Sequence, residues 1–384
     1  MVSLNAKARA AAPSPTMAGA SAPCRHPDPV DLTVGEPEGP PPVEVREAAA
    51  RAALEGRTRY GPAAGLPALR ALVAEDLTRR DGVPRTVENI LVTAGGKPAL
   101  LDALRCLLEP GDEVLVFAPY WPTFRDQILW AGGVPVVVPP GPDLLPEPGA
   151  LQRALTPRTR AVILNQPANT TGRVWDAPRL EALASLVQER NLWVILDQVY
   201  GALTLDGPEV PLLSLFPGLA ARTLLVESFS KRFAMTGYRL GAAAGPRELI
   251  GAMTTLGSTS VTHPCMISQH AGVAALSLDG AWERAQVAAL RLRRDRLRTG
   301  LTALPGVACR VPEGAIYLFP DLSGWLEEHG VATDVDLAAR LRDEAGVKVL
   351  PGSAFGAPGH LRLAIAVSLA DLDRALERMT AFLA

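Results

Sequence analysis

Lysine is scarce in this sequence. The chain has 384 residues with 38 lysines and arginines together, yet four of these are lysines: Lys7, Lys97, Lys231 and Lys348. The formal net charge of -2 at pH 7 gives no electrostatic reason to expect nucleic acid or an anionic membrane surface as a partner. Because arginine meets nearly every other need for a cation, the position of each lysine is informative.

Cysteine and long apolar runs are scarce as well. The four cysteines lie far apart, without a C-x-x-C pair or histidines at ligand spacing, so they suggest neither a disulfide framework nor a metal site. No apolar run approaches the roughly 20 residues of a membrane span. The first 23 residues also lack the compact apolar core of a signal peptide. These absences predict a cytoplasmic globular protein that binds no metal.

Short apolar runs alternate with helical patterns from about Asn89 onward. Continuous strands of this kind are buried on both faces, which predicts a mainly parallel sheet under helices, with functional residues at the carboxyl ends of the strands. The stretch "DAPRLEALASLVQERN" predicts one helix, opened by Asp176 and a proline in the first turn. The expected strands are "ILVT", "EVLVFAP", "AVILN", "LWVILD", "TLLVES" and "LGAAAG".

The pattern changes after the arginine-rich stretch "AWERAQVAALRLRRDRLRTGLTAL", which predicts a long helix. The last hundred residues or so give short strands and two amphipathic helices, "DVDLAARLRDEAG" and "LADLDRALERMTAFL". We expect a large domain over residues 38–284. We expect a smaller α+β domain that combines residues 1–37 with residues 285–384.

Lys231 follows "TLLVESFS", a predicted strand that runs into small hydroxyl residues. A lysine held in a partly dry pocket loses proton affinity and becomes a nucleophile able to form a Schiff base with an aldehyde. Ser228, Ser230 and Arg239 can donate hydrogen bonds to a phosphate on the same ligand. A solvated surface loop would explain Lys231 and Arg232, but not the serines and glycines on both flanks.

Three other polar residues stand where a strand pattern would bury them. Asp197 closes the run "LWVILD", where an acid is costly unless it meets a cation or leaves the sheet at its active edge; a helix cap or loop acid is an equal alternative. Tyr200 follows three residues later. Arg362 shares one strand face with alanines, which leaves room for a carboxylate ligand, although an edge arginine facing solvent is the simpler interpretation without context.

The stretch "VTAGGKPALLDAL" places Gly95 and Gly96 between a strand and a helix, where backbone N–H groups and the helix dipole hold an anion. It is not a Walker loop, because Leu91 stands at the first glycine position and Pro98 at that of Ser or Thr. For Lys97, at the start of the helix, a functional reason and simple surface tolerance remain equally open.

Taken together, these stretches resemble the fold type I aminotransferases of class I/II that depend on pyridoxal phosphate (PLP), a group with bacterial aspartate and aromatic aminotransferases. The resemblance covers nearly the whole chain, from "LTVGEPEG" through "RYGPAAGLPALRALVAE", "NQPANTTG" and "SFSKRFAMTGYRLG" to "PGSAFG" and "LRLAIA". It implies an α/β fold with a mainly parallel seven-stranded sheet and a smaller α+β domain. It also implies PLP as cofactor, amino acid and 2-oxo acid substrates, and a homodimer.

The resemblance further implies a role for each matching residue. Lys231 is the Schiff-base lysine and general base, and Asp197 pairs with the pyridine nitrogen so that the ring can accept electrons. The other expected cofactor contacts are Tyr200, Asn169, Trp121, Gly95, Gly96, Lys97, Ser228, Arg239 and, from a partner subunit, Tyr60. The expected substrate contacts are Arg362, Asn169 and Gly35 for the α-carboxylate, and Lys97 for the distal carboxylate of an acidic amino acid.

Two departures from the family pattern leave the reaction open. Thr170 replaces the proline of the usual Asn-Pro-Thr-Gly, which predicts a reshaped loop around Asn169, and Gln198 replaces the glutamate of Asp-Glu-x-Tyr. The first hypothesis is an amino acid aminotransferase. The alternative is a PLP-dependent lyase or cyclase that eliminates, substitutes or closes a ring on an amino acid. A PLP-binding regulator and a nicotinamide dehydrogenase lack support, since no helix-turn-helix precedes the fold and "GAAAG" supplies no G-x-G-x-x-G.

Overall fold

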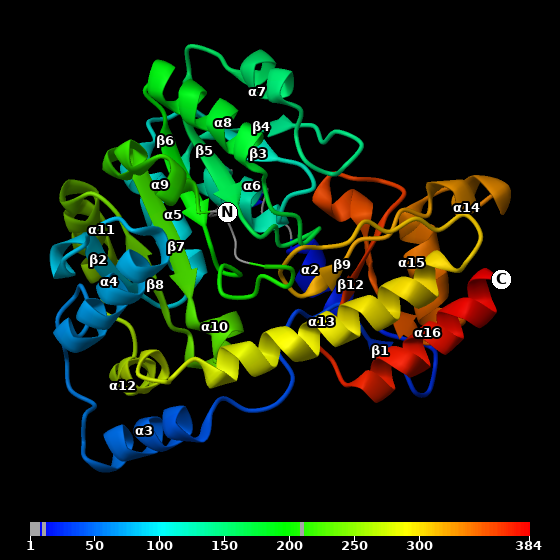
Figure 1. Ribbon diagram of the computed structural model, residues 1–384, viewed down its shortest axis with the longest axis horizontal. Helices are drawn as coiled ribbons and strands as arrows, with labels where there is room; N and C mark the ends of the chain where they lie inside the picture. Colours follow the sequence, from blue (N-terminus) through cyan, green and yellow to red (C-terminus); the bar gives the residue numbers. More distant parts are fainter. Residues whose placement is uncertain (1–7, 10–12, 208–210) are drawn as a thin grey trace, which may run out of the picture.

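A seven-stranded sheet forms the core of the larger part of the computed structural model, on the left in Figure 1. The model describes residues 8–9, 13–207 and 211–384. The strand order is β2-β8-β7-β6-β5-β3-β4. β8 runs antiparallel to both its neighbours, and the other pairs are parallel, so the expectation of a mainly parallel sheet is confirmed. The strands are β2 (Ile90–Thr93), β3 (Glu113–Phe117), β4 (Val134–Val138), β5 (Thr159–Asn165), β6 (Trp193–Asp197), β7 (Thr223–Ser228) and β8 (Gly241–Ala244).

Helices cover both faces of this sheet, because successive apolar side chains of its strands point to opposite sides. Ile195 belongs to the core under α5 (Gly96–Leu107), α6 (Pro122–Ala131) and α11 (Arg247–Ser260). Leu196 belongs to the core under α4 (Pro67–Asp81), α8 (Ala177–Glu189) and α12 (Met266–Leu276). The remaining helices around the sheet are α3 (Val43–Leu54), α7 (Pro148–Ala154), α9 (Leu212–Leu215) and α10 (Phe229–Arg232).

Local sequence explains where these helices begin. The side chain of Asp176 accepts a hydrogen bond from the backbone N–H of Arg179 at 3.0 Å, as expected for an acidic cap. Prolines in the first turn of α4, α6 and α8 fit because the N–H they lack has no partner there. Within the described ranges, every helix is too short or too polar to span a bilayer.

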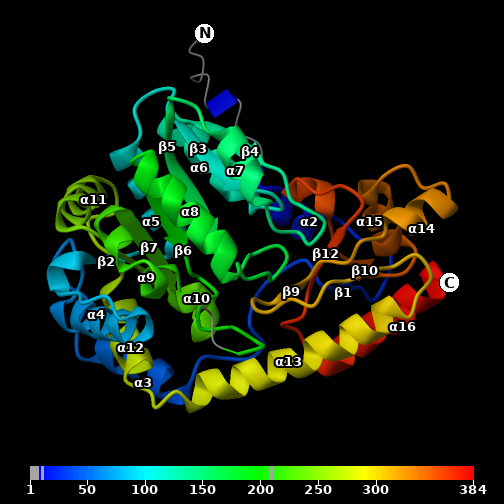
Figure 2. The ribbon, with the colours of Figure 1, turned by 45° about the horizontal axis from the view of Figure 1, so that its top comes forward.

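A second, smaller core lies beside the large sheet and joins the two ends of the chain. β1 (Val30–Asp31) pairs in parallel with β10 (Val347–Lys348), and β12 (Leu361–Ala364) lies between β11 (Leu350–Pro351) and β9 (Tyr317–Leu318). Figure 2 shows α13 (Ala281–Thr302) running from the region of α10 and α12 to α16 (Leu369–Leu383). The other helices of this part are α2 (Pro15–Ser21), α14 (Ser323–Glu328) and α15 (Asp334–Asp343).

The division into residues 38–284 and residues 1–37 with 285–384 stays a prediction. α13 begins at Ala281 and so crosses the predicted boundary after residue 284. Residues 1–7 and 10–12, which the division assigns to the smaller domain, and residues 208–210 of the larger one lie outside the described residues.

Candidate active site

One cavity of about 370 Å³ lies at the carboxyl ends of β6 and β7, where the large sheet faces the smaller core. Its lining includes most of the residues that the sequence singled out. They are Gly35, Gly96, Lys97, Trp121, Asn169, Asp197, Tyr200, Ser228, Ser230, Lys231, Arg239 and Arg362. Gly95 lies beside this cavity, whereas Tyr60 is 90% exposed and does not line it.

Lys231 sits on α10, the short helix that directly follows β7. The side chain of Ser228 caps this helix by accepting a hydrogen bond from the backbone N–H of Ser230 at 3.2 Å. The Lys231 Nζ donates to the carbonyl oxygen of Gly35 at 2.5 Å. Burial lowers the pKa of Lys231, and the charges of Arg239 and Arg362 act in the same direction. The amine is therefore easier to deprotonate than an exposed lysine.

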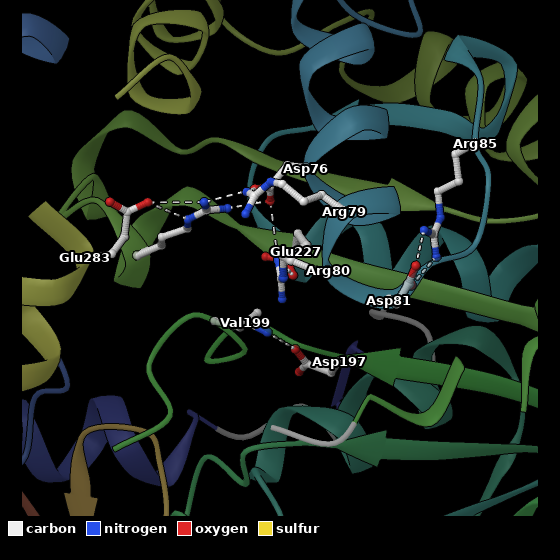
Figure 3. Close-up of polar contacts among 10 residues, drawn as sticks. Asp76, Arg79, Arg80, Asp81, Arg85, Asp197, Val199, Glu227 and Glu283 are labelled. Atoms are coloured by element: carbon white, nitrogen blue, oxygen red, sulfur yellow. Dashed lines mark hydrogen bonds and ion pairs between the residues drawn. The ribbon is translucent and has the colours of Figure 1, made fainter. Parts of the chain in front are cut away.

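Asp197 ends β6 and is 3% exposed. Burial raises its pKa to about 7, although its Oδ1 accepts a hydrogen bond from the backbone N–H of Val199 at 3.1 Å (Figure 3). A buried carboxyl that holds a proton near neutral pH is suited to share that proton with a nitrogen base of similar affinity.

A chain of hydrogen bonds joins the polar residues at the border with the smaller core. Arg362 donates from Nη1 to the Oδ1 of Asn169 at 3.0 Å and from Nη2 to the carbonyl oxygen of Thr33 at 3.2 Å. The Nδ2 of Asn169 in turn donates to the hydroxyl of Tyr200 at 3.0 Å. Arg362 is 2% exposed, so the solvent-facing interpretation of this arginine was wrong.

Tyr317 is a site residue that the sequence reasoning missed. Its hydroxyl lies 3.3 Å from that of Tyr200, and its ring packs 4.1 Å from the Arg362 guanidinium, with Phe355 at 4.6 Å. Burial alone would raise the pKa of Tyr317, but the positive charges of Arg362 and Lys231 outweigh it and leave the pKa below its ordinary value. A side chain at Gly35 would overlap the Tyr317 hydroxyl, so this close approach requires glycine.

The start of α5, at Gly96 and Lys97, lines the cavity together with Ser228 and Arg239. Gly95 precedes the helix with a φ of 97°, in a region that favours glycine. A Cβ at Gly95 would stand 2.7 Å from the Nη2 of Arg239, so glycine here also keeps this arginine at the helix end. N–H groups, a hydroxyl and a guanidinium around one space suit a phosphate.

Lys97 also faces the cavity, with its Nζ 5.0 Å from the centre of the Trp121 ring. Burial lowers the pKa of Lys97, and the nearby charge of Arg239 adds to the effect. Thr16, Met17 and Ala20 of α2 line the same cavity and were not predicted. These residues lie far from the strand-end residues in the sequence, so no sequence pattern indicated that they line the cavity.

The loop around Asn169 keeps its side chain in the cavity despite the missing proline. The cis bonds of the described residues precede Pro119 and Pro167, so the peptide bond before Thr170 is trans. Thr170 is fully buried. The backbone N–H of Asn169 donates to the Oδ1 of Asn165 at 2.6 Å, and this bond helps to hold the loop against the end of β5.

No group of three or more histidine, cysteine or acidic side chains is arranged to hold a metal ion within the described part of the chain. The four cysteines all lie in the described part of the chain, and each is a free thiol.

Comparisons with known proteins agree with this architecture. The family model for aminotransferases of class I and II matches residues 27–379. The chain is 44% identical to an aspartate/prephenate aminotransferase of Thermus thermophilus over 91% of this chain and 90% of that protein. It is 38% identical to the aspartate aminotransferase of Geobacillus stearothermophilus over 93% and 91%, respectively.

Solved structures give the same result. The aspartate aminotransferase from Thermus thermophilus with maleate superimposes with a TM-score of 0.91 at 40% identity, covering 99% of this chain and 100% of that chain. The aspartate aminotransferase from Rhizobium meliloti superimposes with a TM-score of 0.88 at 37% identity, covering 92% and 91%.

Proposed function

Because the chain belongs to the class I and II aminotransferases, which use PLP, we propose that it exchanges the amino group between an acidic L-amino acid and a 2-oxo acid. The main support for this proposal is that two further cations, Arg362 and Lys97, line the cavity besides Lys231 and Arg239. A substrate with two carboxylates matches two such cations. The names of the relatives point the same way, since aspartate and prephenate each carry two carboxylates.

The residues present fit PLP in three respects. Lys231 offers an amine of lowered pKa for the aldehyde, and Asp197 offers a buried carboxyl with a pKa of about 7 for the pyridine nitrogen. The start of α5, with Ser228 and Arg239, offers hydrogen-bond donors for the phosphate. When bound, the cofactor supplies an electron sink for the carbanion formed at the substrate α-carbon.

We assign the remaining cofactor contacts by the position of each side chain around the cavity. All three of Trp121, Tyr200 and Asn169 line the cavity. In this proposal Trp121 covers one face of the ring, and Tyr200 with Asn169 hydrogen-bonds the phenolic oxygen. The backbone of Gly95, Gly96 and Lys97 takes the phosphate together with Ser228 and Arg239.

Lys231 carries the proton in the proposed reaction. Its Nζ accepts the proton from the substrate α-carbon, and burial favours the neutral amine that this step requires. Lys231 would then release that proton toward the cofactor, and one water would free the substrate as an oxo acid while its amino group stays with the cofactor. The Gly35 carbonyl, which accepts from the Nζ, helps to aim the amine.

Arg362 orients the substrate by its α-carboxylate in this proposal. Its planar fork suits a carboxylate, and the contacts with Asn169, Thr33 and the Tyr317 ring hold the fork in one orientation. Lys97, near the Trp121 face, takes the distal carboxylate. The distance between the two carboxylates then selects the acidic substrate.

The proposal includes a homodimer in the cytoplasm. Tyr60 is 90% exposed and Leu54 is 89% exposed, which suits a surface covered by a second copy. Tyr60 then reaches the phosphate site of the partner subunit. The thiols of the four cysteines fit a reducing compartment. Coexpression of Tyr60→Ala and Lys231→Ala chains tests the sharing: mixed dimers regain activity if Tyr60 acts across the interface, and stay inactive if it does not.

The absorption spectrum of the PLP-loaded protein tests the reaction itself. Single amino acids are added without any oxo acid. We expect aspartate or glutamate to convert the cofactor to its pyridoxamine form with one equivalent of oxo acid, and added 2-oxoglutarate or oxaloacetate to restore the original spectrum. Products that accumulate over many turnovers without an acceptor would instead establish the lyase or cyclase alternative. The names of the relatives favour transamination.

A further inference from the structure

A second buried carboxyl lies directly behind the active site and has no part in the function proposed above. Glu227 precedes Ser228 in β7 and is 8% exposed. Side chains alternate along a strand, so Val226 and Ser228 point to the cavity side while Glu227 points to the face covered by α4. Only strong compensation makes a buried acid at this position tolerable.

That compensation is a chain of alternating charges (Figure 3). The Oε1 of Glu227 lies 2.7 Å from the Nη1 of Arg80 in α4, and Arg80 lies 3.6 Å from Asp76, one turn earlier. Asp76 accepts two hydrogen bonds from Arg232, at 2.6 and 3.1 Å. Arg232 also contacts Glu283, in the first turn of α13, at 3.2 Å. We refer to Glu227, Arg80, Asp76, Arg232 and Glu283 as the rear charge chain.

The rear charge chain has one end in α10 and the other end in β7, the strand that pairs with β6. Arg232 follows Lys231 directly in α10, so its two acidic partners hold the helix of the lysine. At the other end, Val226 of β7 pairs with Asp197 of β6. A Cβ at Gly201 would stand 2.5 Å from the Nη2 of Arg80, so the turn after Asp197 packs against this arginine.

The charge of Glu227 also acts on Asp197 through the sheet. Burial is the main reason that the pKa of Asp197 is raised, and the negative charge of Glu227 adds to it. The charged groups that face Glu227 are Arg80 and Asp76 from α4 and Arg232 from α10. Gln198 replaces the usual glutamate of the family pattern and is neutral. The negative charge that acts on Asp197 therefore comes from Glu227 of β7.

We propose that Glu227 is a positioning residue for the cofactor: through the rear charge chain it fixes the end of β6 relative to α10, and its negative charge keeps the proton shared by Asp197 and the pyridine nitrogen in place. This inference rests on the cofactor roles proposed for Asp197 and Lys231. Burial raises the pKa of Glu227, and the charges of Arg80 and Arg232 oppose that rise. In the ionised form that these two cations favour, Glu227 holds the proton on the other side of the sheet. The ring thereby stays protonated, and so remains an effective electron sink, to higher pH than Asp197 alone would allow.

Nitrogen-15 NMR of the holoenzyme, loaded with PLP labelled at the pyridine nitrogen, tests the proposal across a pH titration. In Glu227→Gln we expect the midpoint of pyridine deprotonation to fall by roughly half a unit to one unit, because one nearby negative charge is lost. Glu227→Asp keeps the charge and should stay within about 0.2 unit of the wild-type midpoint. Arg158→Gln is the control for loss of a surface charge, since Arg158 is 70% exposed and pairs with Glu113, which lies outside the rear charge chain.

The outcomes separate this inference from the proposed function. An unchanged midpoint in folded Glu227→Gln, together with a lowered midpoint in Asp197→Asn, refutes the role of Glu227 and leaves the cofactor roles standing. An unchanged midpoint in Asp197→Asn overturns the proposed role of Asp197, and the inference fails with it. A second measurement does not depend on the folding of Glu227→Gln. Carbon-13 NMR of the wild-type glutamate carboxyls, with Glu227 assigned from Glu227→Asp, should show it ionised at neutral pH, and a protonated Glu227 overturns the proposal.

Discussion

Replacing Arg362 with lysine keeps the positive charge in the cavity but removes the planar fork. Arg362 is 2% exposed and is held on two sides, by hydrogen bonds to Asn169 and Thr33 and by the Tyr317 and Phe355 rings. A lysine ammonium is a compact point charge that cannot donate two parallel hydrogen bonds to one carboxylate. We therefore expect the loss to fall on the substrate rather than on the cofactor.

The magnitude follows from the contacts. One charge-assisted hydrogen bond to the substrate contributes about 1.5–3 kcal/mol, and the stacking that orients the guanidinium adds about 0.5–1 kcal/mol. The total of roughly 2–4 kcal/mol corresponds to a fall in kcat/KM for aspartate of roughly 30- to 900-fold. Arg362 has no proposed contact with PLP, so the Kd of the cofactor should change by less than about threefold.

Single-turnover kinetics with aspartate, followed by cofactor absorbance, measure this loss, and titration of the apoprotein measures PLP affinity. Arg158→Lys, at a side chain that is 70% exposed, is the matched control for the same substitution. If Arg362→Lys retains kcat/KM within about threefold of the wild type, the two-point carboxylate contact is refuted. A large loss of PLP affinity would refute the assignment of Arg362 to the substrate.

Three further predictions concern Tyr317, Lys97 and Asp197. Tyr317→Phe removes the hydroxyl contact with Tyr200, so kcat/KM should fall about fivefold, the effect of one neutral hydrogen bond of about 1 kcal/mol, and unchanged kinetics would contradict a role for this hydroxyl. Lys97→Met should lower kcat/KM for aspartate by roughly 10- to 150-fold, with phenylalanine as the internal control, and equal losses for both would argue against contact with the distal carboxylate. The pKa of Asp197 is about 7 in the folded apoprotein and about 4 in the unfolded chain. The stabilising contribution of its protonated carboxyl is therefore complete below about pH 4 and is lost as the pH rises through 7. Urea unfolding of the apoprotein should therefore find Asp197→Asn more stable than the wild type by on the order of 2–4 kcal/mol at about pH 8, with the difference vanishing near pH 4.

The sequence was most informative where local chemistry alone sets the structure. The apolar runs became the strands of the large sheet, and the acid before "APRL" became the cap of α8. Lys231 and Asp197 could be singled out because Asp197 closes one such run and Lys231 comes shortly after another, and strand ends of a parallel sheet meet at one edge. The structure gives the positions of the site residues, and the measurements described above test their predicted roles.

Contacts between distant segments could not be predicted in the same way. Tyr317 lies in an apolar run, "GAIYLF", where a tyrosine is typical of a core position. The pair of Glu227 and Arg80 is separated by 147 positions, and no periodicity brings such residues together. The burial of Arg362 depends on Thr33, which is distant in the sequence, and on the ring of Phe355, which packs against the guanidinium only in the folded chain.

The pairing of β1 with β10 has a consequence for the order in which the protein assembles. Asp31 and Lys348 stand 317 positions apart, and their contact places Thr33 and Gly35 at the cavity. On the ribosome, the strands of the large sheet emerge first and can pair while β10 is still unsynthesised. β12, which carries Arg362, comes still later in the sequence than β10, so a nascent chain that ends before β10 contains Lys231 and Asp197 but lacks Arg362.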